Sequence, residues 1–426
     1  MARFLQGVGK NGTTAAAVTF GSTLTASSYL LCYVYVLRSG NPAPTVSGVS
    51  DSGGNTYTQI ATQAYGGNLA NVYVFAAPNT HGATASNAVT ATVVGTATLT
   101  VIGVMEYAEV NATPTDGINQ TATDSTGTSY TGDSVTTTKA NDVVIGLGYT
   151  TAAGTEVAGT NQITRVTSTA AISFTALDQC PAASGTFNPS STTAGSKETA
   201  LFTIALASSY VIVSNVHTQK ASDTFIRADE NPLTATNWTR GSGLGATSNL
   251  KIVSNQCLPT TSGVGGIEYW STVNPWNADQ YSQFTIQSLA STAGTSAMAN
   301  VRLSSTTNTK YGGGIFSGGS GLGAGCTISI VKNPTGAAVT LVNKRMTISA
   351  GDIFRIDVIG TQLSLWVNGV LQLTAVDSVI AAGNAGLSLQ AVTITHSQVT
   401  AWIGGYVTAP VAAGLPNFLM MMGVGT

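Results

Sequence analysis

The hydrophobic positions of this chain recur with a period of two, in short runs bounded by Gly, Asn, Asp or Ser. Alternation of this kind is typical of β-strands, because successive side chains of a strand point to opposite faces. An apolar period of 3.6 residues, which would indicate a helix, is not sustained along the sequence. The pattern therefore predicts an all-β protein, and turn residues at short intervals favour β-sandwiches over a parallel sheet.

Two segments carry the strongest local signals. Residues 28–37 place Leu, Cys and Val on one face and Tyr and Leu on the other, so both faces are apolar. Such a strand is expected to be covered on each side. Residues 362–373 alternate apolar and polar side chains around Asn368-Gly369. This dipeptide suits the two positive-φ positions of a type I′ turn, so the segment predicts a tight β-hairpin.

The aromatic composition changes near residue 210, which suggests two separate cores. All five tryptophans follow that point: Trp238, Trp270, Trp276, Trp366 and Trp402. We expect a β-sandwich domain at residues 14–209, a linker at 210–218 and a second sandwich at 219–407. Residues 1–13 would then form an N-terminal arm, and residues 408–426 an apolar tail.

The charge of the chain excludes several classes of protein. Only 8% of the 426 residues are charged and the formal net charge is -2, whereas ordinary soluble domains carry about 25% charged residues. Scattered basic residues give no electrostatic footprint for nucleic acid. No apolar run is long enough to cross a bilayer, and no secretory signal peptide is visible. We therefore expect neither nucleic-acid binding nor membrane insertion.

The four cysteines, Cys32, Cys180, Cys257 and Cys326, fall two in each half of the chain. They lack the spacing of a zinc site and are too sparse for a disulfide scaffold. Buried or free thiols are the favoured interpretation. One disulfide bridge per domain, formed after release from a reducing compartment, is the alternative.

The second half resembles the concanavalin A-like lectin and glucanase jelly rolls, the LamG-like modules of bacterial and phage proteins. The matching pieces follow one another in the family's order: residues 223–227, 237–239, 279–286, 301–303, 354–356, 366–369 and 383–387. The resemblance covers about residues 223–405 and implies two antiparallel sheets in a jelly roll. Residues 46–57, 72–76 and 142–146 resemble, less specifically, a β-sandwich module of secreted bacterial and phage structural proteins.

Catalytic residues are not expected in this chain. Laminarinase-type relatives of the jelly roll cleave glycans with a Glu-x-Asp-x-x-Glu strand, and no such segment exists here. The nearest carboxylates are Glu106 and Glu109, but residues i and i+3 of a strand point to opposite faces and do not converge on one bond. The three histidines are far apart in sequence, and no nucleophile elbow is present.

Binding sites are weighed against ordinary structural roles. Tyr269, Trp270 and Trp276 would stack on sugar rings if they lay in a cleft, although core packing is the favoured role. Asp51 and Asn55 have oxygen ligands that suit calcium, although an Asx turn explains them better. No cofactor is expected, with calcium as the alternative.

The tail is apolar and uncharged, and it contains Leu415, Phe418, Leu419, Met420, Met421 and Met422. An exposed patch of this kind invites association, so we expect it to dock on its own domain or, preferably, on a neighbouring subunit.

Together these features resemble a bacteriophage virion protein without enzymatic activity, most simply a capsid decoration or head-fibre protein that displays a lectin-like domain. Its expected partners are other virion proteins, such as the major capsid or tail proteins, further copies of itself, and surface glycans. The expected location is the virion surface. The alternatives are a receptor-binding tail protein or a cell-surface adhesin that recognises host glycans, and, less favoured, a glycan hydrolase.

Overall fold

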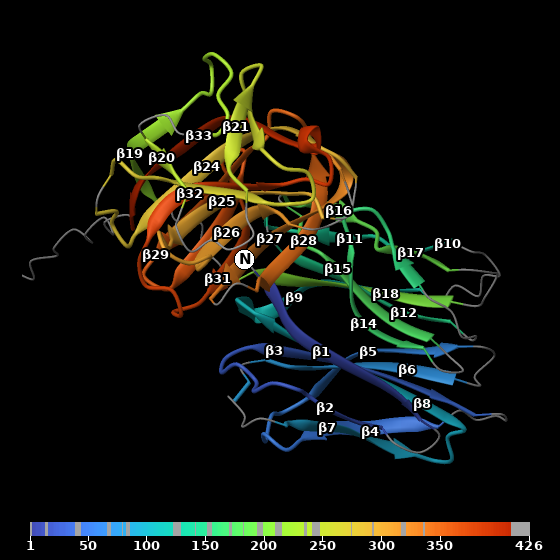
Figure 1. Cartoon of the computed structure of the whole chain (residues 1–426). Helices are drawn as coiled ribbons and strands as arrows, with labels where there is room; N and C mark the ends of the chain where they lie inside the picture. The colour runs from blue at the N-terminus through green and yellow to red at the C-terminus, as the bar shows by residue number, and fades with distance from the viewer. Residues whose placement is uncertain are drawn as a thin grey trace, which may run out of the picture.

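The protein is built almost entirely from β-strands, as the alternation predicted (Figure 1). The computed structural model describes residues 2–12, 16–38, 44–65, 70–78, 80–81, 86–121, 129–140, 142–150, 156–169, 173–181, 183–193, 199–208, 215–233, 237–240, 248–273, 275–291, 294–316, 321–334 and 337–409. Within these ranges the helical structure is one short 3-10 turn, η1 (Ile394–His396). No helix there is long and apolar enough to span a membrane.

The N-terminal half stacks three sheets (Figure 1). The central sheet runs β1 (Arg3–Gly12), β8 (Leu99–Ala108), β3 (Tyr29–Leu37), β6 (Ala70–Ala77) and β5 (Thr58–Tyr65). An outer sheet of β2 (Ala17–Thr19), β7 (Ala88–Val94) and β4 (Thr45–Asp51) covers one face. An inner sheet of β14 (Ile163–Thr169), β15 (Ser173–Gln179), β12 (Val143–Thr150), β18 (Thr199–Ser208) and β9 (Val110–Thr121) covers the other.

Strand β3 explains why there are three layers. Leu30, Cys32 and neighbours pack against the outer sheet, whereas Tyr33, Tyr35 and neighbours pack against the inner sheet. All four side chains are fully buried. The strand is therefore covered on each side, as its two apolar faces predicted. Two short sheets lie beside the inner sheet: β10 (Ser129–Thr131), β17 (Ser190–Thr193) and β13 (Glu156–Ala158) form one, and β11 (Val135–Thr137) and β16 (Gly185–Phe187) the other.

The C-terminal half is a jelly-roll sandwich of two antiparallel sheets. Among the described residues, the eight-stranded sheet contains β21 (Leu250–Val253), β22 (Gln256–Pro259), β33 (Ser397–Thr408), β24 (Gln280–Leu289), β29 (Ile353–Ile359), β30 (Gln362–Val367) and β31 (Val370–Val376), with β19 (Val216–Asp223) paired to β33. The seven-stranded sheet contains β20 (Trp238–Thr239), β23 (Gly266–Trp270), β32 (Asn384–Gln390), β25 (Ser296–Leu303), β26 (Lys310–Ile315), β27 (Gly323–Asn333) and β28 (Val339–Ile348).

The predicted hairpin is present in the eight-stranded sheet. β30 and β31 pair antiparallel, and Asn368 and Gly369 between them have φ values of 51° and 76°. Both positive angles match the type I′ turn that the Asn-Gly pair predicted. Between the sheets, a core of apolar side chains includes Trp238, Trp270, Trp276 and Trp402.

The N-terminal residues and the boundary between the two halves differ from the expected arm and linker. Residues 3–12, expected to lie in an arm, form β1 and pair with β8 at the edge of the central sheet, because their main chain completes the ladder there. At the end of the first half, β18 ends at Ser208, and β19 of the second sandwich begins at Val216. Residues 410–426, which contain the predicted assembly tail, lie outside the described part of the chain.

None of the four cysteines forms a disulfide bond. Cys32, Cys257 and Cys326 are buried and Cys180 is half-buried. The structure therefore agrees with the favoured interpretation of unbridged thiols and not with the alternative of one disulfide bridge per domain.

Candidate functional site

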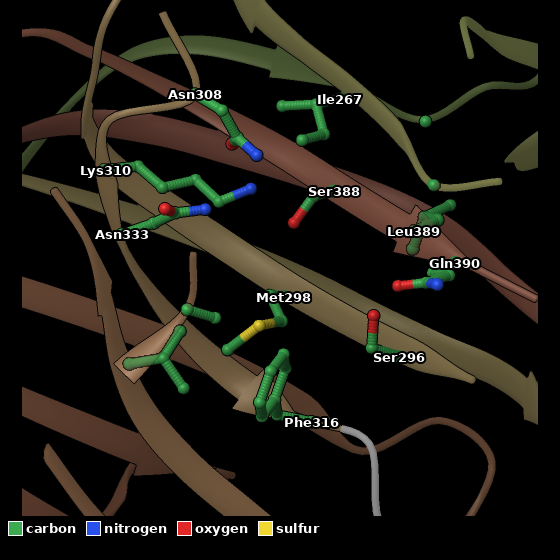
Figure 2. A pocket seen from close by; sticks show the side chains of 14 residues that line it. Ile267, Ser296, Met298, Asn308, Lys310, Phe316, Asn333, Ser388, Leu389 and Gln390 are labelled. Atoms are coloured by element: carbon green, nitrogen blue, oxygen red, sulfur yellow. The ribbon is translucent and has the colours of Figure 1, made fainter. Parts of the chain in front are cut away.

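A hollow of about 280 Å³ lies on the outer face of the seven-stranded sheet. Five strands contribute to it, namely β23, β32, β25, β26 and β27. Its lining includes Ile267, Met298, Lys310, Phe316, Asn333 and Ser388 (Figure 2). We call this hollow the sheet pocket.

The sheet pocket exists because the strands alternate apolar inward and mostly polar outward positions. In β25, Ala297 and Ala299 face the core, while Ser296 and Met298 line the sheet pocket. In β26, Gly312 has no side chain to fill the space; a Cβ there would approach Met298 Cε to 3.2 Å and Asn300 Oδ1 to 3.3 Å. Glycine in a strand interior commonly marks such a close approach.

The sheet pocket contains buried amide groups that lack partners. The Oδ1 atoms of Asn308 and Asn333 are buried and accept no hydrogen bond, and the Nδ2 atom of the neighbouring Asn300 donates none. Asn300 Oδ1 accepts a bond from the Ser388 hydroxyl at 3.3 Å. A buried polar atom without a partner costs free energy, so these groups are prepared for polar atoms of a ligand or for bridging water.

Lys310 is the one ionisable residue among the described residues that line the sheet pocket. It lies directly across from Asn333 in the β26–β27 ladder and is only 6% exposed. Burial lowers the pKa of its ammonium to about 7, because the charged form is poorly solvated there. Figure 2 shows the side-chain ends of Asn308, Lys310 and Asn333 gathered on one side of the sheet pocket, facing Ser388.

The predicted aromatic binding residues lie elsewhere and are mostly buried. Trp270 and Trp276 are 8% and 7% exposed, and both belong to the jelly-roll core. Trp270 stacks on Trp402 at a centroid distance of 5.5 Å, and the Trp276 indole N–H donates to the Trp270 carbonyl oxygen at 2.9 Å. Their faces are therefore occupied by core neighbours, which is the core-packing role that the sequence favoured over sugar stacking. Tyr269 is half-buried against Ile267 and Leu303.

The candidate calcium ligands form a hydrogen-bonded turn. The Asp51 carboxylate accepts from the main chain and side chain of Asn55 at 3.0 and 2.7 Å, from Asn87 at 3.0 Å and from Tyr57 at 3.1 Å. These donors outweigh the opposing effect of burial and lower the pKa of Asp51. The Asn55 Oδ1 atom accepts from the His81 amide at 2.8 Å. These oxygens already hold the turn together, as an Asx-type role requires.

Glu106 and Glu109 have different partners, but not for the reason expected from a single strand: Glu106 lies on β8, whereas Glu109 lies between β8 and β9 with a φ of 58°. Glu106 accepts from the Thr25 amide at 2.6 Å and from the Gln6 side chain at 2.7 Å. Glu109 instead pairs with Arg3 at 3.3 Å and accepts from Thr374 at 3.0 Å. Within the described ranges, no group of three or more His, Cys, Asp or Glu side chains could hold a metal ion.

Sequence reasoning did not identify the sheet pocket. Its side chains come from strands that are neighbours only in the folded sheet, so no local motif connects them. One signal was available: Lys310 is followed by Tyr311 and then three consecutive glycines within a strand pattern. Glycine inside a strand often marks a place where a ligand or another part of the chain approaches closely.

A scan against protein-family models and a search of curated proteins both find no match. Among solved structures, the chain is similar to the carbohydrate-binding module CBM66 from Bacillus subtilis, with 14% identity over 42% of this chain and 98% of that one, and a TM-score of 0.31. It is also similar to the CBM2 module of the evolved Dit of Lactobacillus casei BL23 phage J-1, with 10% identity, 47% and 100% coverage and a TM-score of 0.33. A third structure, BuGH16Bwt, shares 9% identity over 46% of this chain and 95% of that one, at a TM-score of 0.31. Likenesses at these values say nothing about the function of this chain.

Proposed function

We propose that this chain is a non-catalytic saccharide-binding protein whose jelly roll holds a sugar in the sheet pocket. The observation that carries the proposal is the set of unpartnered buried amide groups in a hollow of about 280 Å³. Sugar rings present several hydroxyl groups, each of which both donates and accepts hydrogen bonds. The amide oxygens of Asn308 and Asn333 need hydrogen-bond donors, and the hydroxyl groups of a sugar supply them.

The composition of the sheet pocket supports binding rather than hydrolysis. Glycoside hydrolysis ordinarily uses two carboxyl groups on either side of the scissile bond. The described lining of the sheet pocket contains no Asp or Glu. Apolar surface from Ile267, Met298 and Phe316 accompanies the amides, a mixture that is typical of ligand sites in which a few polar groups orient the ligand.

A glycan array followed by calorimetry on the bound glycans tests this proposal. The double variant Asn308→Ala with Asn333→Ala should weaken binding about tenfold or more, since two hydrogen bonds are lost. Gln219→Ala, which removes an exposed amide on β19 of the other sheet, is the matched control and should bind normally. Absence of any glycan binding by the folded wild-type chain would refute the function.

We also propose that the protein is located on the surface of a phage particle. The low charge and the layered β-structure are compatible with this location. In this arrangement the three stacked sheets of the N-terminal half attach to the particle, and the jelly roll faces outward. In this form the protein is a capsid decoration or head-fibre protein with other virion proteins as partners; a receptor-binding tail protein or cell-surface adhesin is the alternative.

Deletion of residues 410–426 tests the attachment. The shortened chain should remain folded and still bind sugar but lose its oligomer or its place on the particle. Light scattering coupled to size-exclusion chromatography measures the first, and particle co-sedimentation the second. Unchanged assembly would remove the tail from this role.

A further inference from the structure

Lys310 differs from the other buried lysine ammonium groups of this fold in having no partner. Lys344, which is also buried, donates to the Cys180 carbonyl oxygen at 2.6 Å, and the half-buried Lys332 pairs with Asp377 at 2.6 Å. Lys310 makes no hydrogen bond or ion pair with any residue in the described part of the chain. A buried cation without a counterion is costly, and its persistence in a hollow suggests that a ligand supplies the missing charge.

The groups around Lys310 sharpen the chemistry of that ligand. Asn333, its cross-strand neighbour, and Asn308, two residues before it, both offer unpartnered buried oxygens. These oxygens require hydroxyl or amide donors close to the negative group that Lys310 requires. An isolated small anion satisfies the lysine but leaves both oxygens unpaired.

The local electrostatics leave Lys310 available to an anion. Glu268 of β23 and Lys332 of β27 are ionisable residues of the neighbouring strands, but each is next in sequence to a lining residue, Ile267 or Val331, and so points to the opposite face. Tyr311, which follows Lys310 on β26, lies in the core, and its hydroxyl donates to Asp377 at 2.6 Å. From β25 and β32, the lining side chains Met298, Ser296, Ser388 and Gln390 are uncharged. No acidic group among the described residues therefore neutralises Lys310.

From this geometry, and resting on the proposed saccharide binding, we propose that the sheet pocket selects a sugar that carries a carboxylate. The carboxylate of the sugar pairs with the Lys310 ammonium, while ring hydroxyls donate to Asn308 and Asn333. The apolar face of the ring lies against Met298 and Phe316. The ligand class is a uronic or sialic acid unit, at a chain end or as a side branch of a larger glycan.

This pairing makes binding depend on pH. Burial holds the pKa of Lys310 at about 7 in the free protein. An anionic ligand binds the protonated form, so affinity is highest below pH 7 and falls as the pH rises through that value, where the unbound lysine is neutral. A neutral sugar has no such dependence on Lys310.

The decisive experiment compares matched sugars on the full chain by calorimetry. The probes are methyl glucuronide against methyl glucoside, methyl galacturonide against methyl galactoside, N-acetylneuraminate, and acetate as a carboxylate without a sugar. The wild type should bind at least one carboxylated sugar about tenfold or more tightly than its neutral partner or acetate. Lys310→Met should abolish that preference and the pH dependence between pH 6 and 8. Lys220→Met, which removes an exposed lysine from β19, should change neither.

Each other outcome has a definite meaning. Equal binding of acidic and neutral sugars, unaffected by Lys310→Met, overturns the acidic preference while the proposed saccharide binding stands. Acetate binding as well as the acidic sugars reduces the sheet pocket to an anion site and overturns the sugar class. Binding of none of the sugars refutes the proposed function itself, and with it this inference.

Discussion

Arg165 donates two hydrogen bonds to Asn343, from Nη1 to the side-chain oxygen at 2.8 Å and from Nη2 to the main-chain oxygen at 3.0 Å. Arg165 belongs to β14 of the N-terminal body and Asn343 to β28 of the jelly roll. Nε of the same guanidinium pairs with the buried Asp178 at 2.8 Å, and its plane lies over the Phe4 ring. Arg165 is therefore one of several side chains that join the two sandwiches; Lys344 and Thr374 of the jelly roll also donate to Cys180 and Glu109 of the N-terminal half.

Arg165→Ala should destabilise the N-terminal half and weaken its coupling to the jelly roll. The variant leaves the Asp178 carboxylate buried without its cation, and breaking a buried ion pair in this way costs about 3–5 kcal/mol. Differential scanning calorimetry should show the N-terminal body unfolding earlier, separated from the jelly roll. Lys10→Ala, at an exposed position of β1, is the control and should leave the thermogram unchanged. A single unshifted transition in Arg165→Ala would show that this contact does not couple the halves.

The sequence predicted the elements of the fold better than their stacking. The alternation of hydrophobic and polar residues predicted the strands, and the two apolar faces of β3 predicted that this strand is covered on both sides. That the covers are two different sheets could not be deduced, because pairing partners such as β3 and β8 are separated by about sixty residues and strand order follows from packing. The same holds for β1: residues 1–13 were expected to form an arm, whereas the main chain of β1 completes the ladder with β8.

The site was predicted less well, for a physical reason. Aromatic residues attract attention as sugar-stacking groups, but Trp270 and Trp276 are large apolar side chains and the core needs their volume. The sheet pocket depends instead on missing side chains at Gly312 and on amides brought together from different loops and strands. Neither feature produces a local spacing that sequence patterns report.

Trp270→Ala should destabilise the jelly roll without altering the chemistry of the sheet pocket. Trp270 packs edge-on to Trp238 at 5.4 Å and stacks on Trp402 at 5.5 Å, so truncation opens a cavity between them. The expected cost is about 3–5 kcal/mol, measured by chemical denaturation monitored by fluorescence. Trp270→Phe retains part of the ring contact and should lose less. If Trp270→Ala kept wild-type stability but lost sugar binding, the indole would be a binding residue after all.

The thiols should react slowly in the native protein. Burial raises the pKa of Cys32, Cys180 and Cys257, and that of Cys326 to about 11, so little thiolate is present at neutral pH. We expect a thiol-specific chromogenic reagent to modify Cys180 first, because it is only half-buried, and all four thiols after unfolding. Cys180→Ser should remove the first phase. Fewer than four reactive thiols in the unfolded, unreduced chain would instead show a disulfide.

Glu268 should make the jelly roll less stable as the pH rises. Its Oε1 accepts from the Leu250 amide at 2.9 Å, but Oε2 has no partner, and burial raises the pKa of the carboxyl to about 8. In the unfolded chain the pKa returns to about 4.3. As the pH rises, the unfolded chain therefore loses this proton at a lower pH than the folded protein does. The contribution of this group to stability is full below about pH 4.3 and falls until the pH exceeds about 8.

Glu268→Gln keeps an acceptor for Leu250 and does not titrate, so its melting temperature should vary less with pH and exceed that of the wild type near pH 8. Asp229→Asn, at an exposed position of the same sandwich, is the control for general charge effects, because the asparagine oxygen can still accept from the Ser254 amide. If the melting temperatures of the wild type and Glu268→Gln changed equally with pH between pH 5 and 8, a protonated Glu268 in the folded protein would be contradicted.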